Sequence, residues 1–326
     1  MPPRHEFMER ADPFRGELTA HCYRMLGSAH DAEDLVQEAY LRGWRHYPSF
    51  KGRSSLRTWP YRIATSACLR ELENRTRRVL PAGLTGPTGD PNAELDESRA
   101  TPWVEPFPDA WLLPSEPETA VVAREGVRLA LVAALQELPA RQRAVLILRD
   151  VVQFSATEVA ELLDTTPAAV NSALQRARAH LAAVRPSEDD TPALAEPAHR
   201  VLVDRYAAAF ERADIPALTR LLRDDVRLEM PPLRTWFTGR AAVTAFLATH
   251  VLTRRGDLAM VPTAANGEPA LAAYRRRSDP VLRAHALHLL TPAGANADNE
   301  RICQITVFLD PTLFHLFGLP ATRAAS

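Results

Sequence analysis

Lysine is almost absent from this chain of 326 residues: Lys51 is the only one, so nearly all of its positive charge comes from arginine. Cysteine is scarce as well, and the three cysteines, Cys22, Cys68 and Cys303, lie far apart. Their number is odd and their spacing fits neither a metal site nor a disulfide framework, so we expect small buried thiols. The sequence therefore indicates no metal site.

Long apolar runs are also missing. No stretch of about 20 apolar residues is present that could cross a membrane, and the polar N-terminus "MPPRHEFMERADPF" has no apolar core of a signal peptide. We therefore expect a cytoplasmic protein with no membrane partner. The formal net charge of -1, with 46% hydrophobic and 24% charged residues, is typical of a folded chain. The length predicts two or three domains.

Proline-rich segments divide the chain into three blocks. Residues 79–120 are rich in proline, carry eight acidic residues against the single Arg99, and show no helical or strand periodicity. Such a segment buries too little surface to order itself, which predicts a long acidic linker. Residues 185–197 have the same character and predict a second linker. The predicted folded blocks are 10–78, 121–184 and 198–326.

The first block is predicted to be helical. Ser28 and Asp31 have the spacing of a capped helix start, and an apolar stripe follows at Leu35, Val36, Ala39 and Leu41. The other face of this helix is acidic: Asp31, Glu33, Asp34, Gln37 and Glu38. A solvated face is the ordinary explanation, but an acidic patch directly before a basic one suggests two different partners.

The basic patch is residues 50–78, which hold eight basic and two acidic residues with Phe50, Trp59 and Tyr61 among them. A solvated charged face is again the ordinary explanation. Cations interleaved with flat rings are, however, also what a surface for single-stranded nucleic acid needs. Pro60 is tolerated only in the first turn of a helix, which predicts a helix that begins near residues 57–59.

The second block contains helix-turn-helix spacing. One helix is predicted from about Ser155 to Leu163, followed by a turn and a second helix with Thr166 as N-cap and Pro167 at its first position. The second helix has an apolar seam at Val170, Leu174, Ala177 and Leu181. Its opposite face carries Ala168, Asn171, Ser172, Gln175 and Arg176, the side chains of a recognition helix. An ordinary helical hairpin is the alternative.

The third block changes from helices to strands. Helices are predicted near residues 198–212, 215–223 and 240–251, with Asp214 as a cap. Strand-like runs are "VRLEM", "DLAMVPTAA", "PALAAYRRR", "LRAHALHLLTP" and "RICQITVFLD", and "AANGEP" is a plausible hairpin turn. Helices followed by an antiparallel sheet predict an α+β domain of about 130 residues.

These residues resemble known families. "DAEDLVQEAYLRGWRHYPSFKGRSSLRTWPYRIATSACLRELENR" resembles region 2, and "LPARQRAVLILRDVVQFSATEVAELLDTTPAAVNSALQRARAHL" region 4, of the extracytoplasmic-function (ECF) group of the sigma-70 family, which are bacterial initiation factors. The third block is similar to the cone-shaped SnoaL-like polyketide-cyclase superfamily through "YAAAFERADIPALTRLLRDDVRLEMPP", "WFTGRAAVTAFL" and "FLDPTLFHLFGLP". The expected fold class is multidomain, with all-α regions 2 and 4 followed by an α+β SnoaL-like domain.

The resemblance implies a sigma factor that binds core RNA polymerase, recognises the -35 and -10 promoter elements and starts transcription. The partners it implies are promoter DNA, the clamp of the largest polymerase subunit and the flap of the second largest. The acidic linker would pass through the polymerase channel. The residues implied are, for the polymerase, Asp31, Asp34, Gln37 and Glu38; for the -10 element, Lys51, Arg57, Trp59, Tyr61, Arg62, Ser66, Arg75, Arg77 and Arg78; for the -35 element, Thr166, Ala168, Asn171, Ser172, Gln175 and Arg176. Which of Trp59 and Tyr61 faces DNA stays open.

The third block offers fewer signals for chemistry. His285 and His288 lie three apart on a predicted strand and so point to opposite faces. Candidate pocket residues are Tyr206, Trp236, Tyr274 and His285, with Asp204, Glu229 and Asp310 as further titratable groups, and no spacing forces them together. We expect a regulatory domain that needs no cofactor, with a small-molecule ligand as an option. The alternative is a cyclase-like enzyme or ligand sensor fused to a DNA-binding regulator.

Overall fold

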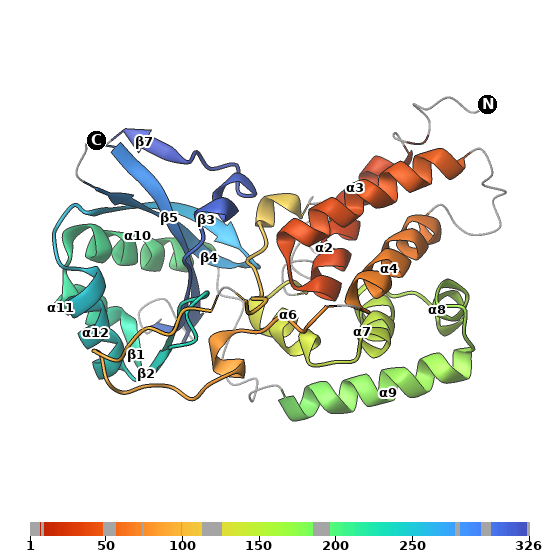
Figure 1. Cartoon of the computed structure of the whole chain (residues 1–326), viewed down its shortest axis with the longest axis horizontal. Helices are drawn as coiled ribbons and strands as arrows, with labels where there is room; N and C mark the ends of the chain where they lie inside the picture. The colour runs from red at the N-terminus through yellow and green to blue at the C-terminus, as the bar shows by residue number, and fades with distance from the viewer. Residues whose placement is uncertain are drawn as a thin grey trace. The chain divides into compact units, whose positions relative to one another are not determined.

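The computed structural model describes residues 7, 10–47, 57–73, 75–98, 100–112, 126–184, 196–277, 281–294 and 301–324. They form two compact units, each assembled from two stretches of the chain. The first unit combines Met1–Arg78 with Asp109–Pro186, and the second combines Val79–Pro108 with Ser187–Ser326. Figure 1 labels most of their helices and strands. The predicted linker is therefore divided between the two units.

The N-terminal half of the first unit is helical, as predicted. After a 3-10 turn, η1 (Asp12–Phe14), come α2 (Arg15–Leu26), α3 (Ala29–His46) and α4 (Thr58–Leu72). The Ser28 hydroxyl accepts a hydrogen bond from the Asp31 amide at 3.1 Å, which confirms the predicted cap of α3. Helix α4 begins at Thr58 and so holds Pro60 in its first turn, where no helical hydrogen bond is lost.

The C-terminal half of the first unit contains the predicted helix-turn-helix. A 3-10 turn, η4 (Asp109–Trp111), is followed by α6 (Leu129–Gln136), α7 (Ala140–Leu146) with its π-helical extension η5 (Ile147–Val151), α8 (Ala156–Leu162) and α9 (Pro167–Val184). Ser155 and Glu158 form a capping box at α8. The Thr166 hydroxyl caps α9 by accepting from the Ala169 amide at 3.2 Å. The seam Val170, Leu174, Ala177 and Leu181 is buried, so this prediction is confirmed.

Two buried arginines join the halves of the first unit. Arg143 donates to the carbonyl oxygen of Met25, and at 2.6 Å to the side-chain oxygen of Gln136. Arg24 donates to the carbonyl oxygen of Gly126 at 2.7 Å. Burial lowers the pKa of both guanidinium groups to about 10, which still leaves them charged at neutral pH. Because a buried charge without partners is very costly, these bonds fix how α2 meets α6 and α7.

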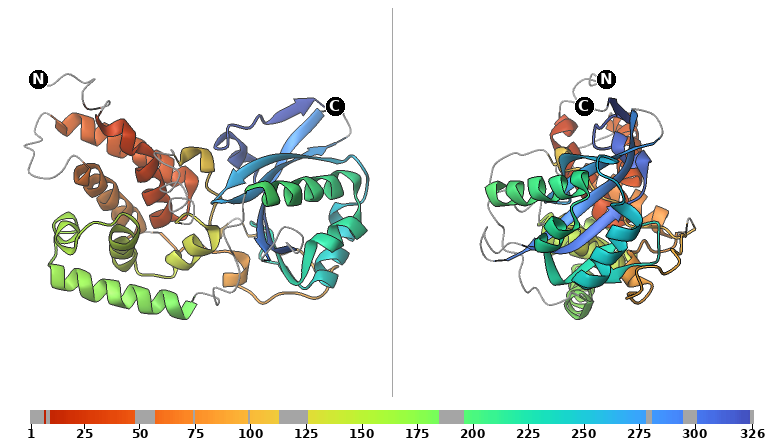
Figure 2. Two further views of the ribbon diagram at one scale, coloured as in Figure 1. Left: turned by 180° about the vertical axis from the view of Figure 1, so that it is seen from behind. Right: turned by 90° about the vertical axis from the view of Figure 1, so that its left-hand side faces the viewer.

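The second unit is a helix-backed sheet. Its helices are α10 (Glu196–Arg212), α11 (Ile215–Leu221) and α12 (Arg240–Phe246) with the π-helical extension η6 (Leu247–Val251). The strands are β1 (Leu222–Glu229), β2 (Phe237–Thr238), β3 (Leu258–Ala265), β4 (Glu268–Arg276), β5 (Val281–Ala293), β6 (Arg301–Phe308) and β7 (Thr322–Ala324). Figure 2 shows this unit from two further directions. The predicted α+β fold is confirmed.

The sheet order is β2-β1-β6-β5-β4-β3, with β7 paired to β5. All neighbours are antiparallel except β1 and β6, which run parallel. The prediction of a purely antiparallel sheet is therefore wrong at this pair. Parallel neighbours need a long crossover connection, and the chain from β1 through α12 and β3 to β5 provides one before β6. The turn at Asn266 and Gly267, with φ of 57° and 70°, is the tight hairpin predicted from "AANGEP".

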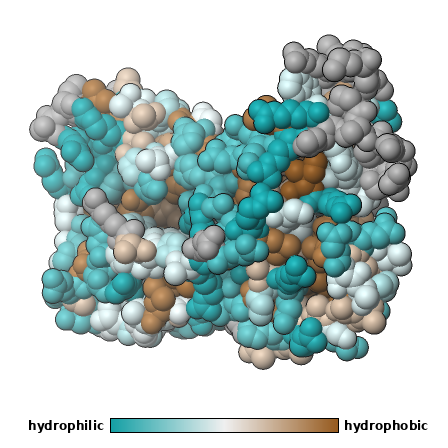
Figure 3. Space-filling model, turned by 45° about the vertical axis from the view of Figure 1, so that its right-hand side comes forward, coloured by the Kyte–Doolittle hydropathy of each residue, from teal (hydrophilic) through white to brown (hydrophobic). Residues whose placement is uncertain are grey.

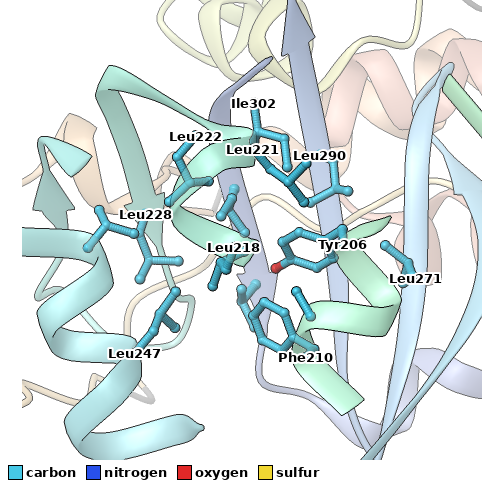
Figure 4. Packing of buried hydrophobic residues seen from close by; sticks show 14 of the residues in the cluster. Tyr206, Phe210, Leu218, Leu221, Leu222, Leu228, Leu247, Leu271, Leu290 and Ile302 are labelled. Carbon is cyan, nitrogen blue, oxygen red and sulfur yellow. The ribbon is translucent and has the colours of Figure 1, made fainter. Parts of the chain in front are cut away.

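The core of the second unit lies between α10 and one face of the sheet. Figure 4 shows Tyr206 and Phe210 of α10 lying toward Leu271 and Leu290 on the strands. The hydroxyl of Tyr206 is 2.9 Å from Nδ1 of His288, so this polar pair is satisfied inside an otherwise apolar core. The interior contacts come from long side chains on helix and sheet, which fill the centre of the cone.

The linker prediction needs a correction. Residues 79–98 and 100–108 follow a defined path on the second unit, and residues 113–120 lie outside the described residues. The Thr88 amide donates to the Trp236 carbonyl oxygen at 2.9 Å, and the Ser98 amide to that of Pro232 at 3.0 Å. The segment has no core of its own, as its composition indicates, but the C-terminal domain supplies partners for its backbone. Composition alone therefore predicted a segment without order, whereas contacts with the C-terminal domain give it a defined path.

We predict that His288 makes the second unit sensitive to acid. Burial lowers its pKa to about 3, below the usual 6.5. The unfolded chain therefore binds a proton that the folded one does not, so this contribution is complete above about pH 6.5 and is lost as the pH falls toward 3. Between pH 6.5 and 4.5 the loss is about 2–3 kcal/mol.

His288→Gln keeps an acceptor for Tyr206 and removes this titration. The second unit of the variant should show a smaller fall in melting temperature between pH 6.5 and 4.5 than the wild type. The first unit is an internal control, because its own buried histidine, His21, has a pKa of about 3 and is unchanged. Equal slopes for the second unit in both proteins would contradict the assignment.

Candidate nucleic-acid interface

The outer face of α9 carries the residues predicted to read DNA. Thr166, Ala168, Asn171, Ser172, Gln175 and Arg176 are all exposed. Their amide, hydroxyl and guanidinium groups lie in the N-terminal half of the helix, the half that reaches base edges in helix-turn-helix proteins. The next arginine, Arg178, instead forms two bonds to Asp150, of 2.9 and 2.6 Å, and so fixes α9 against η5.

The exposed face of α4 contains only some of the DNA-contact residues predicted from the sequence. Arg62, Ser66 and Arg70 are exposed and follow one another at intervals of four, so they share one helical face. Arg70 was not among the predicted contact residues, although its i+4 spacing from Ser66 is a signal that could have found it. Lys51 lies outside the described residues. The positions 62, 66 and 70 are thus the candidate contact line of this helix.

The structure shows which of the two aromatic residues of α4 lies in the hydrophobic core. Tyr61 is only 2% exposed, its ring centre lies 5.2 Å from those of His21 and Phe154, and its hydroxyl donates to Glu17 at 3.2 Å. Burial raises the pKa of Tyr61. The predicted stacking of this ring on a base therefore finds no open face here. Trp59 is half-buried, which leaves it as the ring with accessible surface.

Most predicted phosphate contacts pair with carboxylates of the same unit. Arg57 binds Glu17 at 3.1 Å, and Arg77 binds Glu137. Asp31 binds both Arg75 and Arg78, the latter at 2.7 Å. Asp31 was predicted to face polymerase, and Arg75 and Arg78 to face DNA. Opposite charges on neighbouring faces attract, so these residues of the acidic and basic patches pair with each other.

The outer face of α3 combines acidic residues with one apolar residue. Asp34, Gln37 and Glu38 are exposed, as predicted. Leu41, placed on the apolar stripe from the sequence, is 56% exposed. The stripe prediction fails there because Leu41 stands at i+4 from Gln37 and i+7 from Asp34, which is the outer side of the helix. An exposed leucine ringed by polar groups is typical of a contact surface.

One exposed ion pair links α4 to the helix-turn-helix. Arg62 lies 3.3 Å from Asp164, which sits in the turn between α8 and α9. The two side chains are 55% and 83% exposed, so water screens the pair and its contribution to stability is small. The candidate -10 and -35 surfaces therefore meet in the first unit through a contact that is easily broken.

The structure does not bring the predicted pocket residues of the C-terminal domain together. Tyr206 faces His288 in the core, whereas the hydroxyl of Tyr274 donates to the Pro320 carbonyl oxygen and its ring packs on Phe314. The indole of Trp236 donates to the linker. His285 falls at a bulge of β5, where it is skipped in the pairing with β4. His288, not His285, is therefore the histidine that meets Tyr206.

The remaining titratable candidates are also dispersed. Asp204 is exposed, and Asp310 caps the 3-10 turn η7 (Pro311–His315) through the Thr312 amide. Glu229 is buried, and burial raises the pKa of its carboxyl group. Across the described ranges, no group of three metal-ligating side chains occurs, and no helix is both long and apolar enough to span a membrane. Figure 3 shows a face of mixed polarity with scattered hydrophobic groups.

Comparison with known families follows this division of the chain. Residues 12–78 match the model of sigma-70 region 2, and residues 128–181 match that of sigma-70 region 4. Residues 203–308 match the SnoaL-like domain. The fold and the exposed helix-turn-helix thus define a sigma-70-type transcription initiation factor that carries a SnoaL-like extension.

Similar proteins indicate which group of sigma-70-type factors the chain belongs to. The chain is 48% identical over 319 residues to the ECF RNA polymerase sigma factor SigG of Mycobacterium tuberculosis, covering 97% of this chain and 85% of that protein. It is 29% identical to the ECF factor SigW of Bacillus subtilis over 173 residues, covering 53% and 84%. The crystal structure of the M. tuberculosis ECF factor SigJ superposes with a TM-score of 0.59 at 25% identity, covering 96% of this chain and 99% of that one. The chain belongs to the ECF sigma factors, which act with RNA polymerase at promoter DNA.

We predict that Tyr61 serves folding and not base stacking. Tyr61→Phe removes only the bond to Glu17, so stability falls by about 1 kcal/mol and promoter-dependent transcription stays near the wild-type level. Tyr61→Ala leaves a cavity beside His21 and Phe154 and costs about 3–5 kcal/mol. Denaturant unfolding and run-off transcription measure the two effects. A normally stable Tyr61→Phe protein with lost transcription would show that the hydroxyl acts on DNA.

Proposed function

We propose that α9 reads the -35 element, that the outer face of α4 with Trp59 contacts the opened -10 element, and that the outer face of α3 docks on the polymerase clamp. The observation that supports this assignment most strongly is the division of α9 into two faces. Its apolar seam is buried, while every residue predicted to read DNA is exposed. A hairpin helix with only a structural role has no need of such a face.

The chemistry of α9 favours contacts in the major groove. Asn171 and Gln175 lie one turn apart, and amide side chains form paired bonds to adenine. Arg176 offers a guanidinium for guanine or phosphate. Ala168 and Ala173 are small, so the helix backbone can approach the bases closely. This pattern favours a readout in which few side chains carry the sequence preference and DNA shape contributes the rest.

The chemistry of α4 favours the nucleic-acid backbone and an unpaired base. Arg62 and Arg70 supply two cations along one face, with the Ser66 hydroxyl between them. Trp59 lies one turn before Arg62 and supplies an aromatic surface at the start of the helix. Cations beside an aromatic ring suit single-stranded DNA, which an initiation factor must hold once the duplex opens.

The outer face of α3 suits a protein partner. Leu41 offers apolar area at its centre, while Asp34, Gln37 and Glu38 offer polar groups at its edge. An apolar centre inside a polar rim is the usual composition of a protein interface. This helix surface is assigned to the clamp of the largest polymerase subunit, and region 4 to the flap of the second largest.

Promoter binding requires the first unit to open. The centres of the -10 and -35 elements are roughly 25 base pairs apart, about 85 Å at 3.4 Å per base pair. In the first unit, α4 touches the turn before α9 through Arg62 and Asp164 at 3.3 Å. One protein conformation cannot satisfy both. We therefore assign this arrangement to the free factor, which separates its two regions when polymerase and promoter bind.

The C-terminal domain is assigned a regulatory role. The dispersal of Tyr206, Tyr274 and His285 favours this over acid-base catalysis, which needs its groups around one substrate. No observation in the described residues favours the cyclase alternative.

Replacing α9 side chains tests the -35 assignment. Asn171→Ala and Gln175→Ala should each lower promoter-dependent run-off transcription with core polymerase by about 5- to 100-fold, because a paired base contact is worth about 1–3 kcal/mol. Ala182→Ser, on the C-terminal half of the same helix, is the matched control and should transcribe normally. Unchanged output from both amide variants would refute the readout.

Replacing Leu41 tests the docking surface. Leu41→Asp should weaken holoenzyme formation by about tenfold or more, since it places a charge in the apolar centre of the interface. Because Leu41 is exposed, the free protein should keep its melting temperature. Ala130→Asp, at an exposed position of α6, controls for added charge. Native gel titration with core polymerase gives both affinities, and equal values for Leu41→Asp and wild type would remove α3 from the interface.

A further inference from the structure

The C-terminal domain binds the linker between regions 2 and 4 through hydrogen bonds, as a protein binds a peptide ligand. In Figure 1 its orange segment runs beside β1 and β2 of the second unit. Backbone and side-chain hydrogen bonds join it to the loop that follows β1. The amides of Thr88 and Ser98 donate to the carbonyl oxygens of Trp236 and Pro232, the Arg234 amide donates to that of Asp96, and the Trp236 indole donates to that of Thr85. Backbone groups on both sides are thus paired.

Side chains of the domain add specificity at both ends of the segment. At the start, the Ala82 amide donates to Oε2 of Glu229 at 2.9 Å, and Gln304 donates to the other carboxyl oxygen at 3.1 Å. At the end, the Phe107 amide donates to Oδ1 of Asn266 at 2.8 Å, and the Asn266 amide donates back to the Phe107 carbonyl oxygen at 2.9 Å. Phe107 is fully buried. The domain therefore grips two separated points.

The bound segment closes on itself. The Val79 amide donates to the Pro102 carbonyl oxygen at 3.1 Å, and the Val104 amide donates to that of Val79 at 3.0 Å. Residues 79–104 consequently begin and end at the same place, and add almost nothing to the distance that the chain can span between regions 2 and 4. Released and extended, about 26 residues would reach about 85–90 Å.

The held loop shortens the tether between the regions. With residues 79–108 on the domain, only residues 109–127 remain between that anchor and the start of region 4. About 19 residues reach about 65 Å when pulled straight, which is less than the roughly 85 Å between the two promoter elements. The loop is also held lightly: from Ala82 to Glu97 nearly every residue is exposed, so water competes for its hydrogen bonds.

We propose that the C-terminal domain is a receptor for the linker between regions 2 and 4, and that by holding residues 79–108 as a closed loop it limits how far the two regions can separate. This proposal rests on the proposed function, which requires that separation. Release of the loop lengthens this tether, and it frees the acidic segment for the polymerase. The domain thus acts on transcription through chain length and needs no contact with DNA.

A reversible cross-link tests the proposal in the full chain. Val79 and Trp103 face each other in a parallel bridge where the loop closes, so Val79→Cys with Trp103→Cys places two thiols across the closure, and their disulfide joins the two ends of the loop. Oxidised protein, with the loop locked, should give at least tenfold less run-off transcript than the same protein reduced. The single cysteine variants control for the substitutions and for the natural thiols. Equal transcription by the locked and reduced forms would overturn the proposal.

Hydrogen exchange gives a second readout that does not depend on promoter activity. The amides of Ala82, Thr88 and Ser98 should exchange at least tenfold more slowly in the free chain than after core polymerase is added. Trp236→Phe, which keeps the ring and loses the bond to Thr85, should raise exchange of these amides several-fold without polymerase. Trp111→Phe in the first unit is the control. Amides that stay protected in the polymerase complex would overturn linker release.

The two readouts separate the possible failures. If the reduced cysteine protein makes no promoter-dependent transcript, the proposed function fails, while the exchange measurement still decides whether polymerase releases the linker. If the reduced protein transcribes and the locked one does so equally, only the linker proposal fails.

Discussion

The guanidinium of Arg143 is the interaction around which the first unit is built. It is buried, and it donates to the side-chain and carbonyl oxygens of Gln136 and to the carbonyl oxygen of Leu138, at 2.6, 3.0 and 3.1 Å. These bonds lie inside region 4. Only its bond to the Met25 carbonyl oxygen reaches region 2. The charge therefore keeps most of its partners when the regions part, and water can replace the one that is lost.

The contacts between regions 2 and 4 in the first unit differ in strength. Apolar packing of Tyr61 on Phe154 and the buried bond from Arg24 to Gly126 resist separation of the two regions. The exposed pair of Arg62 and Asp164 contributes little to stability, although it engages one arginine of the candidate DNA surface of α4. Separation of the two regions on polymerase thus has to offset mainly the loss of buried apolar contacts.

The sequence predicted those parts of the structure that local chemistry determines. Ser28, Pro60, Thr166 and Asp214 mark helix starts through caps and fixed φ angles, and Asn266 with Gly267 marks a hairpin, so all were found. The candidate -35 face also followed from helical periodicity. These features need only neighbours within a few residues.

Features that depend on distant residues were missed. Tyr61 is core because His21 and Phe154 arrive from elsewhere in the chain, and Asp31 is neutralised by arginines more than 40 positions away. The bulge that turns His288 toward Tyr206 depends on pairing with β4. Composition predicted a linker that does not order itself, but it contains no information on whether another part of the chain provides a template.

The same reasoning explains why the linker has this composition. Proline keeps the unbound segment extended and reduces the entropy that it loses on binding, while acidic side chains keep it soluble when it is released. A more hydrophobic linker would bind the domain too tightly to leave, and a segment of glycine and serine would lose more entropy on binding. Proline, exposed acids and a few buried anchors, among them Val104 and Phe107, together give a segment that can be both held and released.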